Sequence, residues 1–393
     1  MLPEKTRSIV KATVPALKLH GEAITSHFYA LMLSEHPELK AFFNETHQRE
    51  GTQARALAGA VLAYAEHIDR LVAIAPALPR IIQKHVALGI RPDHYPIVGS
   101  ALLRAIRAVL GDAATDEVMQ AWADAYGSLA DLLIHAEEEV YAATEATPGG
   151  WRGTRRFRVT RKERESELIT SFYLEPVDGA PLLKFRPGQF LTLVLDLKGR
   201  EIRRNYSLSD APGKPWYRIS VKREPGGEAS NWLHDRLHAG MTVDVLPPAG
   251  EFILDESSTR PIVLVTGGVG ITPALSMLEA AADSGRSIHF IHAALHSGVH
   301  AFRHRVEQLA SLNEDILPLF LYDEPREDCP PHQPGRVTQA LLEQVLPADR
   351  DVDLYFLGPK GFMKAMFGIT RDLGIPPAQV RFEFFGPLEV MTG

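Results

Sequence analysis

Apolar and polar positions follow three different patterns along this chain. Up to about residue 144, apolar residues recur at three- and four-residue steps, which is typical of amphipathic helices. Beyond a breaker-rich hinge at 145–153, alternating runs bounded by Gly and Pro predict the strands of a small antiparallel barrel. From about Arg260, strand and helix patterns alternate, which indicates a doubly wound parallel sheet. The pattern therefore predicts an all-α, an antiparallel β-barrel and an α/β domain over residues 1–144, 150–256 and 260–393.

The composition is that of a multidomain globular enzyme. The chain has 393 residues, of which 45% are hydrophobic and 23% charged, and its net charge of -7 argues against a nucleic-acid partner. A single cysteine, Cys329, excludes an internal disulfide framework and any site that needs several cysteine ligands. We find no signal peptide and no apolar run long enough to cross a membrane, so we expect a cytoplasmic protein.

One histidine in the helical part lies on an apolar face. A helix predicted from about Pro76 to Gly89 places His85 on a stripe with Ile81 and Leu88. A neutral imidazole that points into an apolar pocket suits the proximal side of a haem iron. A buried histidine satisfied by a neighbouring carbonyl is the alternative.

Polar side chains beside large apolar ones lie upstream of this histidine. Tyr29 shares a helical face with Leu33, as Gln53 does with Leu57, and the segment between them ends in Phe43, whose ring could lie flat on a porphyrin. In this order and spacing the residues resemble the globin module of the flavohaemoglobins. The resemblance implies distal roles for Tyr29 and Gln53, haem packing by Phe43 and Leu57, and iron ligation by His85.

The same resemblance implies that Tyr95 and Glu137 lie near the proximal imidazole. A carboxylate that accepts the second ring N–H would fix the tautomer and push electron density toward iron, which favours O–O bond chemistry over reversible oxygen carriage. The alternative for Glu137, one of three consecutive glutamates, is a solvated helix face.

Two segments of the predicted barrel carry candidate flavin chemistry. Arg204-Asn205-Tyr206-Ser207 follows a charged turn and is expected to begin a strand, with Arg204 and Tyr206 on one face and Ser207 on the other. A glycine pair ending at Gly227 leads into Ser230, the predicted N-cap of a helix whose free N–H groups could receive a pyrophosphate.

With the Arg186–Phe190 run, these segments closely resemble the FAD-binding domain of the ferredoxin-reductase superfamily. The resemblance implies that Arg204 and Ser230 serve phosphate, Tyr206 the flavin chain and Ser207 the flavin ring. Phe190 stands where relatives often carry Tyr; it could pack on the flavin but cannot donate a hydrogen bond.

The α/β part contains two candidate nucleotide loops. A buried-strand run over 261–265 leads into a turn with Gly267, Gly268, Gly270, Thr272 and Pro273, and a helix is expected from Ala274. The turn departs from the GxGxxG fingerprint because Pro273 replaces the third glycine, so a plain tight turn is the alternative.

With the loop at Gly358 and Pro359, this turn resembles the nicotinamide half of the same superfamily. The resemblance implies that Phe385 covers the flavin; Phe384 stands where many relatives have cysteine. Arg303 and Arg305 leave the choice between NADH and NADPH open, and we prefer NADH.

The resemblance covers nearly the whole chain in the order globin, FAD barrel, nicotinamide domain, which is specific to flavohaemoglobins. It implies that NAD(P)H reduces FAD, that FAD reduces haem b, and that O2 bound under Tyr29 and Gln53 converts nitric oxide to nitrate. We expect Lys84, through a haem propionate or Glu383, to contribute to the interface between domains. An oxygen store or sensor, and a reductase of flavins, ferric chelates or hydroperoxides, are the alternatives. We expect a monomer, and a lipid in the distal pocket stays open.

Overall fold

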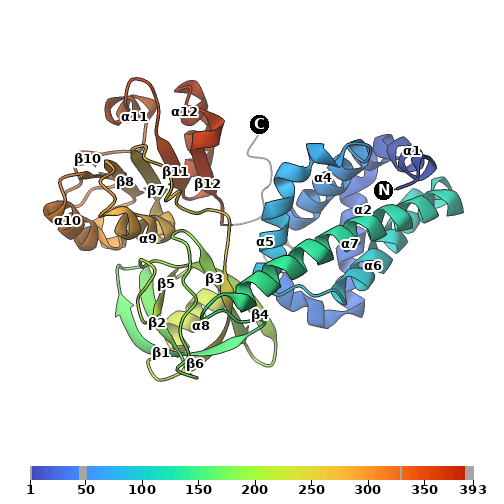
Figure 1. The fold of residues 1–393 in the computed structure, drawn as a ribbon, viewed down its shortest axis with the longest axis horizontal. Helices are drawn as coiled ribbons and strands as arrows, with labels where there is room; N and C mark the ends of the chain where they lie inside the picture. The colour runs from blue at the N-terminus through green and yellow to red at the C-terminus, as the bar shows by residue number, and fades with distance from the viewer. Residues whose placement is uncertain (1, 44–50, 328–329, 386–393) are drawn as a thin grey trace.

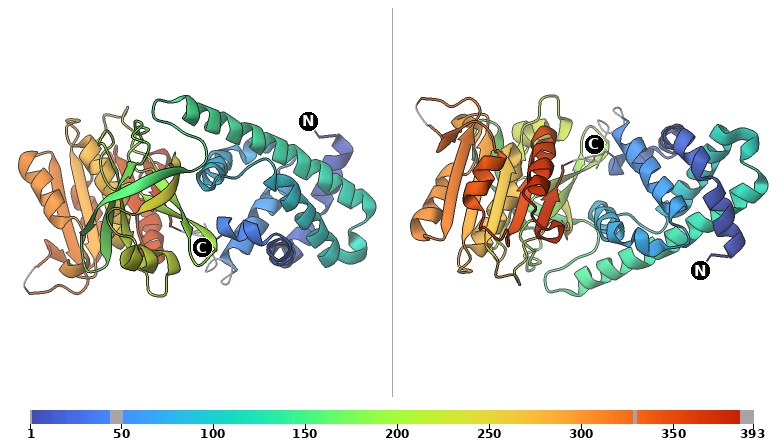
Figure 2. Two further views of the ribbon diagram at one scale, coloured as in Figure 1. Left: turned by 90° about the horizontal axis from the view of Figure 1, so that it is seen from below. Right: turned by 90° about the horizontal axis from the view of Figure 1, so that it is seen from above.

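Three lobes follow one another along the chain (Figure 1). The computed structural model describes residues 2–43, 51–327 and 330–385. The helical lobe and the parallel-sheet lobe lie at opposite ends of an elongated molecule, with the antiparallel sheet between them (Figure 2). This order confirms the predicted fold class. Cys329 and the tail from residue 386 lie outside the described residues.

The first lobe is a packed set of helices around one apolar core. Its longest helix, α7, begins after Thr115, whose hydroxyl accepts a hydrogen bond from the Val118 amide at 3.3 Å, and it runs on to the hinge that leads into the barrel. Its helices are α1 (Glu4–Ala12), α2 (Val14–Glu35), α4 (Thr52–Glu66), α5 (Leu78–Leu88), α6 (His94–Leu110) and α7 (Asp116–Ala146), with short 3-10 turns η1 (Pro37–Phe42), η2 (Leu71–Ala73), η3 (Ala75–Ala77) and η4 (Gly111–Ala113).

Helix α5 matches the prediction made for the histidine segment. It carries a proline in its first turn and ends at Gly89, which adopts the left-handed conformation at φ 72°. The amide of Ile90 donates to the His85 carbonyl at 3.0 Å and the amide of Gly89 donates to the Val86 carbonyl at 2.9 Å. These two hydrogen bonds end the helix, and the left-handed Gly89 changes the direction of the chain after it.

The second lobe is a closed antiparallel barrel. Its strands are hydrogen-bonded in the order β4-β3-β6-β1-β2-β5, and a bridge between Leu208 and Ile219 joins the two outer strands. The elements are β1 (Arg155–Arg164), β2 (Ile169–Pro176), β3 (Phe190–Asp196), β4 (Glu201–Ser207), β5 (Tyr217–Lys222), α8 (Glu228–Arg236) and β6 (Thr242–Ala249).

The third lobe is a parallel sheet in the order β10-β9-β8-β7-β11-β12. Apolar runs along its central strands are buried on both faces, as the sequence pattern predicted. Its elements are β7 (Ile262–Gly267), η5 (Gly268–Gly270), α9 (Ile271–Ala281), β8 (Ile288–Ala294), η6 (Ser297–Val299), α10 (Arg303–Leu312), β9 (Ile316–Tyr322), β10 (Gln333–Pro334), α11 (Gln339–Val345), β11 (Asp353–Leu357), α12 (Lys360–Asp372), η7 (Pro377–Gln379) and β12 (Val380–Glu383).

Three local predictions are wrong. Arg204–Ser207 forms the second half of β4 rather than its start, because pairing with β3 extends back to Glu201. The N-cap of α8 is Gly227, so Ser230 is the third residue of that helix. Helix α9 begins at Ile271 rather than Ala274, since a proline is tolerated in a first turn whose N–H groups have no partner within the helix.

The globin-like lobe docks on the barrel through helix α5. Ala87 of α5 forms a small apolar cluster with Phe190 of β3 and Ala249 of β6. Beside this cluster, the Gly250 amide donates to Oε1 of Gln83 at 3.4 Å. The helix that carries the candidate iron ligand therefore lies directly on the barrel. Within the residues described, no helix has the length and apolar character needed to span a bilayer.

Candidate functional site

Three side chains from three helices meet on the proximal side. Nδ1 of His85 on α5 lies 2.7 Å from Oε1 of Glu137 on α7 and 3.1 Å from the Tyr95 hydroxyl on α6. The Tyr95 hydroxyl donates to the same Glu137 oxygen at 2.6 Å. Glu137 is only 2% exposed, so the solvated-face alternative is wrong. The carboxylate accepts a hydrogen bond from the N–H at Nδ1 and leaves Nε2, the other ring nitrogen, as the atom that can bind iron.

Tyr95 is held as a neutral donor in this cluster. Burial raises the pKa of its hydroxyl, and the hydrogen bond and negative charge of Glu137 raise the pKa further. Tyr126 supports the segment from behind, because its hydroxyl donates to the Tyr95 carbonyl at 2.6 Å. The cluster thus has one fixed acceptor and two donors, an arrangement that fits a haem ligand whose tautomer is set by the protein.

The distal candidates also come together. The Tyr29 ring is buried, and its hydroxyl shares a hydrogen bond with the Gln53 side chain. Burial raises the pKa of Tyr29, whereas the bond to Gln53 lowers it. The Phe43 ring meets the Tyr29 ring edge-on, with centroids 5.5 Å apart, and Leu57 packs against the same core. A protonated tyrosine and an amide in an apolar surround can hydrogen bond to a small diatomic ligand.

Strand β4 presents its candidate flavin residues on two faces, as alternation predicted. Tyr206 pairs with Leu191 and packs on the barrel core, whereas Ser207 pairs with Phe190 on the other face. The Ser207 hydroxyl oxygen is buried and has no hydrogen-bond partner among the described residues. Because a buried polar group without a partner is costly, this oxygen fits a site that a polar ring atom of a cofactor would fill.

Arg204 lies near the start of helix α8. Burial lowers the pKa of its guanidinium, and the negative charge of Glu228, the first residue of α8, raises it. Ser230 accepts a hydrogen bond from the Glu224 amide at 3.1 Å, and a Cβ at Gly227 would lie 2.6 Å from the Ser230 oxygen. Ser230 therefore closes the turn, and Arg204 lies within electrostatic range of the first residue of the helix whose N-terminus could hold a phosphate.

The glycines of the turn after β7 are needed for close packing, in addition to any role in nucleotide binding. A Cβ at Gly270 would lie 2.3 Å from the Leu357 carbonyl oxygen, and one at Gly267 would lie 3.1 Å from Pro359 Cδ. The two predicted loops are therefore pressed together at the carboxyl edge of the sheet. Gly268, at φ 54°, faces open space and is the position where a phosphate group has room.

The remaining residues of this turn and its partner loop are tightly placed. Thr272 is buried and its hydroxyl donates to the Val269 carbonyl at 3.0 Å, while Pro273 completes the first turn of α9. A Cβ at Gly358 would lie 2.5 Å from the Phe362 ring, so this glycine is required by close packing.

The C-terminal segment comes close to helix α5. Burial raises the pKa of Glu383 to about 7, and the positive charges of Arg80 and Lys84 on α5 lower it. Oε2 of Glu383 is buried and has no hydrogen-bond partner within the described part of the chain. Phe385 is 47% exposed. Sequence reasoning missed Arg80, although its position one helical turn before Lys84 was a usable signal.

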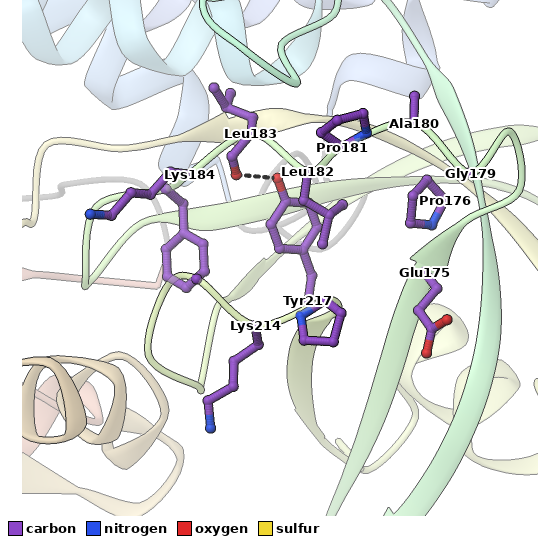
Figure 3. Close-up of a pocket in the computed structure, with 13 residues that line it drawn as sticks. Glu175, Pro176, Gly179, Ala180, Pro181, Leu182, Leu183, Lys184, Lys214 and Tyr217 are labelled. Carbon is purple, nitrogen blue, oxygen red and sulfur yellow. Dashed lines mark hydrogen bonds between the residues drawn. The ribbon is translucent and has the colours of Figure 1, made fainter.

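A separate cavity of about 430 Å³ opens on the barrel (Figure 3). Its wall includes Leu182, Lys184 and Lys214, and the Tyr217 hydroxyl donates to the Leu183 carbonyl at 2.6 Å beside it. None of the candidate flavin residues lines this cavity, so we do not assign it to the flavin site.

Family models match each lobe of the chain. A globin model matches residues 26–133, an oxidoreductase FAD-binding domain matches 156–253, and an oxidoreductase NAD-binding domain matches 264–367. These matches lie in the three lobes that hold the proximal cluster, strand β4 and the glycine turn.

Relatives match over the full length. A flavohemoprotein of Pseudomonas aeruginosa is 54% identical over 388 residues, which is 98% of each chain. The crystal structure of a flavohemoglobin from Malassezia yamatoensis with bound FAD and heme has a TM-score of 0.85 and 26% identity, covering 98% of this chain and 100% of that one. The FAD/NAD-binding domain of a nitric oxide dioxygenase from Vibrio cholerae has a TM-score of 0.55 and 33% identity, covering 59% of this chain and 99% of that one.

Proposed function

Because this chain belongs to the flavohemoprotein family, we propose that it acts as a nitric oxide dioxygenase. The family assignment makes it an NAD(P)H-dependent oxidoreductase with haem and FAD as cofactors. The observation that carries the finer proposal is the buried Glu137–Tyr95–His85 cluster. A negative charge placed on the proximal imidazole favours oxygen activation and has little use in a simple oxygen store.

The cofactors supply hydride acceptance, one-electron transfer and oxygen binding when bound. The side chains of the protein position the groups that react. Glu137 holds the proton on Nδ1 of His85, and Tyr95 keeps this carboxylate in position. On the other side, Tyr29 and Gln53, whose side chains are hydrogen-bonded to each other, would hydrogen bond to the bound reactants in a pocket that large apolar side chains shield from water.

Docking of α5 on the barrel supports a direct electron path. His85 lies on the same helix as Ala87, which contacts Phe190, and Phe190 is paired with Ser207 on β4. The candidate iron ligand and the candidate flavin-ring residue therefore lie on elements that contact each other, α5 and the β3–β4 pair. We infer that electrons pass from the flavin to the haem across this contact.

We further propose that NADH is the preferred donor. Arg305 Nε lies 2.7 Å from Glu279 Oε1, and Arg303 Nε lies 2.8 Å from Glu307 Oε1. Both guanidinium groups thus form ion pairs with carboxylates in the same domain. They would have to give up these pairs to bind the extra phosphate of NADPH.

The test is to quantify nitrate against NADH in the intact protein supplied with nitric oxide and O2. Hydride delivers two electrons and each turnover consumes one, so we expect two nitrate ions for each NADH oxidised. Cleavage of the chain near Pro148 should leave a globin part that turns over once and stops with oxidised iron. Nitrate formed through many turnovers without NADH would refute the electron path.

The same measurement separates the alternatives. A reductase of flavins or ferric chelates would oxidise NADH with those acceptors and yield no nitrate, and it would keep this activity without haem. An oxygen store or sensor would bind O2 reversibly and consume little NADH.

A further inference from the structure

One arginine of the barrel reaches into the globin-like lobe. Arg203 on β4 points its guanidinium at the end of α5, where Nη1 donates to the carbonyl oxygen of Leu88. Its other nitrogens, Nε and Nη2, lie 2.9 Å and 2.8 Å from Oε1 of Glu201. The side chain is only 14% exposed. All three guanidinium nitrogens are therefore committed, one to the partner lobe and two to an anchor on the same strand.

The acceptor in the globin-like lobe is well suited to a cation. The last carbonyl groups of a helix lack partners within the helix and lie at the negative end of its dipole. In α5 the closing turn already satisfies the carbonyls of His85 and Val86, and Arg203 takes the carbonyl of Leu88. The left-handed Gly89 makes room for this contact, because a Cβ there would lie 2.9 Å from Nη1 of Arg203.

Arg203 also contacts a second globin segment. Its guanidinium carbon lies 4.2 Å from the centroid of the Phe42 ring, within the range of a cation–π interaction. Phe42 ends η1 and immediately precedes Phe43, the predicted haem-packing residue. A cavity of about 430 Å³ lined by Phe42, His94 and Arg203 lies at this junction. Arg203 therefore joins two separate segments of the globin-like lobe to the barrel at this junction.

The placement of Arg203 on β4 links both candidate cofactor sites. Arg203 and Ser207 share one face of the strand and lie about 13 Å apart at the usual rise per residue. Leu88 lies three residues after His85, about one helical turn away. We propose that Arg203 is a positioning residue for electron transfer from the flavin to the haem. The proposal rests on the electron path inferred above and concerns its second step alone.

The test separates the two electron-transfer steps in the full-length protein loaded with haem and FAD. In anaerobic stopped-flow mixing with NADH, Arg203→Met should leave the rate of flavin reduction unchanged. The following haem reduction should slow by roughly tenfold, because a hydrogen bond to a charged group that holds the docked arrangement contributes on that order. Arg203→Lys, which keeps the charge, should restore part of the rate.

The matched control is Arg161→Met. Arg161 also pairs with a glutamate, with Nη1 3.2 Å from Glu163 Oε1, and stacks on an aromatic ring, at 3.6 Å from the Tyr173 centroid. Since these contacts stay within the barrel, this variant should keep both rates. As a readout independent of turnover, Arg203→Met should increase hydrogen–deuterium exchange at the end of α5.

A second variant tests the proposal if Arg203→Met does not fold. Glu201→Gln removes the ionic anchor while keeping the arginine, and it should slow haem reduction alone, to a smaller extent. The proposal is overturned if both variants reduce haem at the wild-type rate, or if flavin and haem reduction slow equally. Absence of haem reduction through the flavin in the unmodified protein would instead refute the proposed electron path.

Discussion

Replacing Glu137 by glutamine should raise the midpoint potential of the haem. One oxygen, Oε1, accepts both the His85 bond at 2.7 Å and the Tyr95 bond at 2.6 Å. A glutamine carbonyl oxygen can occupy that position and keep both bonds, so the substitution removes the charge and little else. Without the negative charge, the imidazole donates less electron density and stabilises the oxidised iron less.

The size of the shift follows from the strength of the bond to His85. A hydrogen bond to a charged partner contributes about 1.5–3 kcal/mol and a neutral one about 0.5–1.5 kcal/mol, so the change is about 1–1.5 kcal/mol. At about 59 mV per 1.4 kcal/mol for one electron, the potential should rise by about 40–65 mV.

Spectroelectrochemical titration of the full-length protein measures both cofactors at once, and the flavin potential serves as an internal reference. Glu138→Gln is the matched control, because Glu138 is exposed and pairs with Arg152 at 2.7 Å, away from the imidazole. A haem potential that stays constant or falls in Glu137→Gln would refute the reasoning.

Three further predictions test other parts of the molecule. Tyr29→Phe should speed oxygen dissociation by about one to two orders of magnitude, since a lost hydrogen bond to a partly charged ligand costs about 1.5–3 kcal/mol. Flash photolysis measures the dissociation rate. The control is Tyr64→Phe, because the hydroxyl of Tyr64 donates to the Ala125 backbone carbonyl at 2.9 Å instead. His85→Ala should abolish the normal reduced-haem spectrum while NADH still reduces ferricyanide through the flavin; an unchanged spectrum would contradict the iron assignment. Burial lowers the pKa of His292 to about 3, whereas the unfolded value is near 6.5. Below pH 6.5 the unfolded state therefore binds more protons, and the free energy of opening β8 should fall by up to about 1.4 kcal/mol per pH unit. Hydrogen exchange of β8 against pH measures this dependence: His292→Gln should make it shallower, the exposed His135→Gln should leave it unchanged, and equal pH dependence in wild type and His292→Gln would contradict the prediction.

The periodicity of the sequence determined the three lobes. Helical and strand repeats are local properties, because each residue's face depends only on its neighbours along the same element. The apolar stripe of α5, the alternation of β4 and the buried strand β7 were therefore predictable. Errors occurred at element ends, such as Ser230 and Ile271, where capping and strand pairing decide the boundary.

Only the tertiary structure determined which functional groups touch. Glu137 comes from a run of three glutamates, and packing of α5, α6 and α7 alone turns this one toward His85 and Tyr95. The contact of Arg203 with Leu88 joins residues 115 positions apart and has no local signature. Such contacts depend on how complete elements pack, because side-chain direction is set locally while distance between elements is set by the whole core.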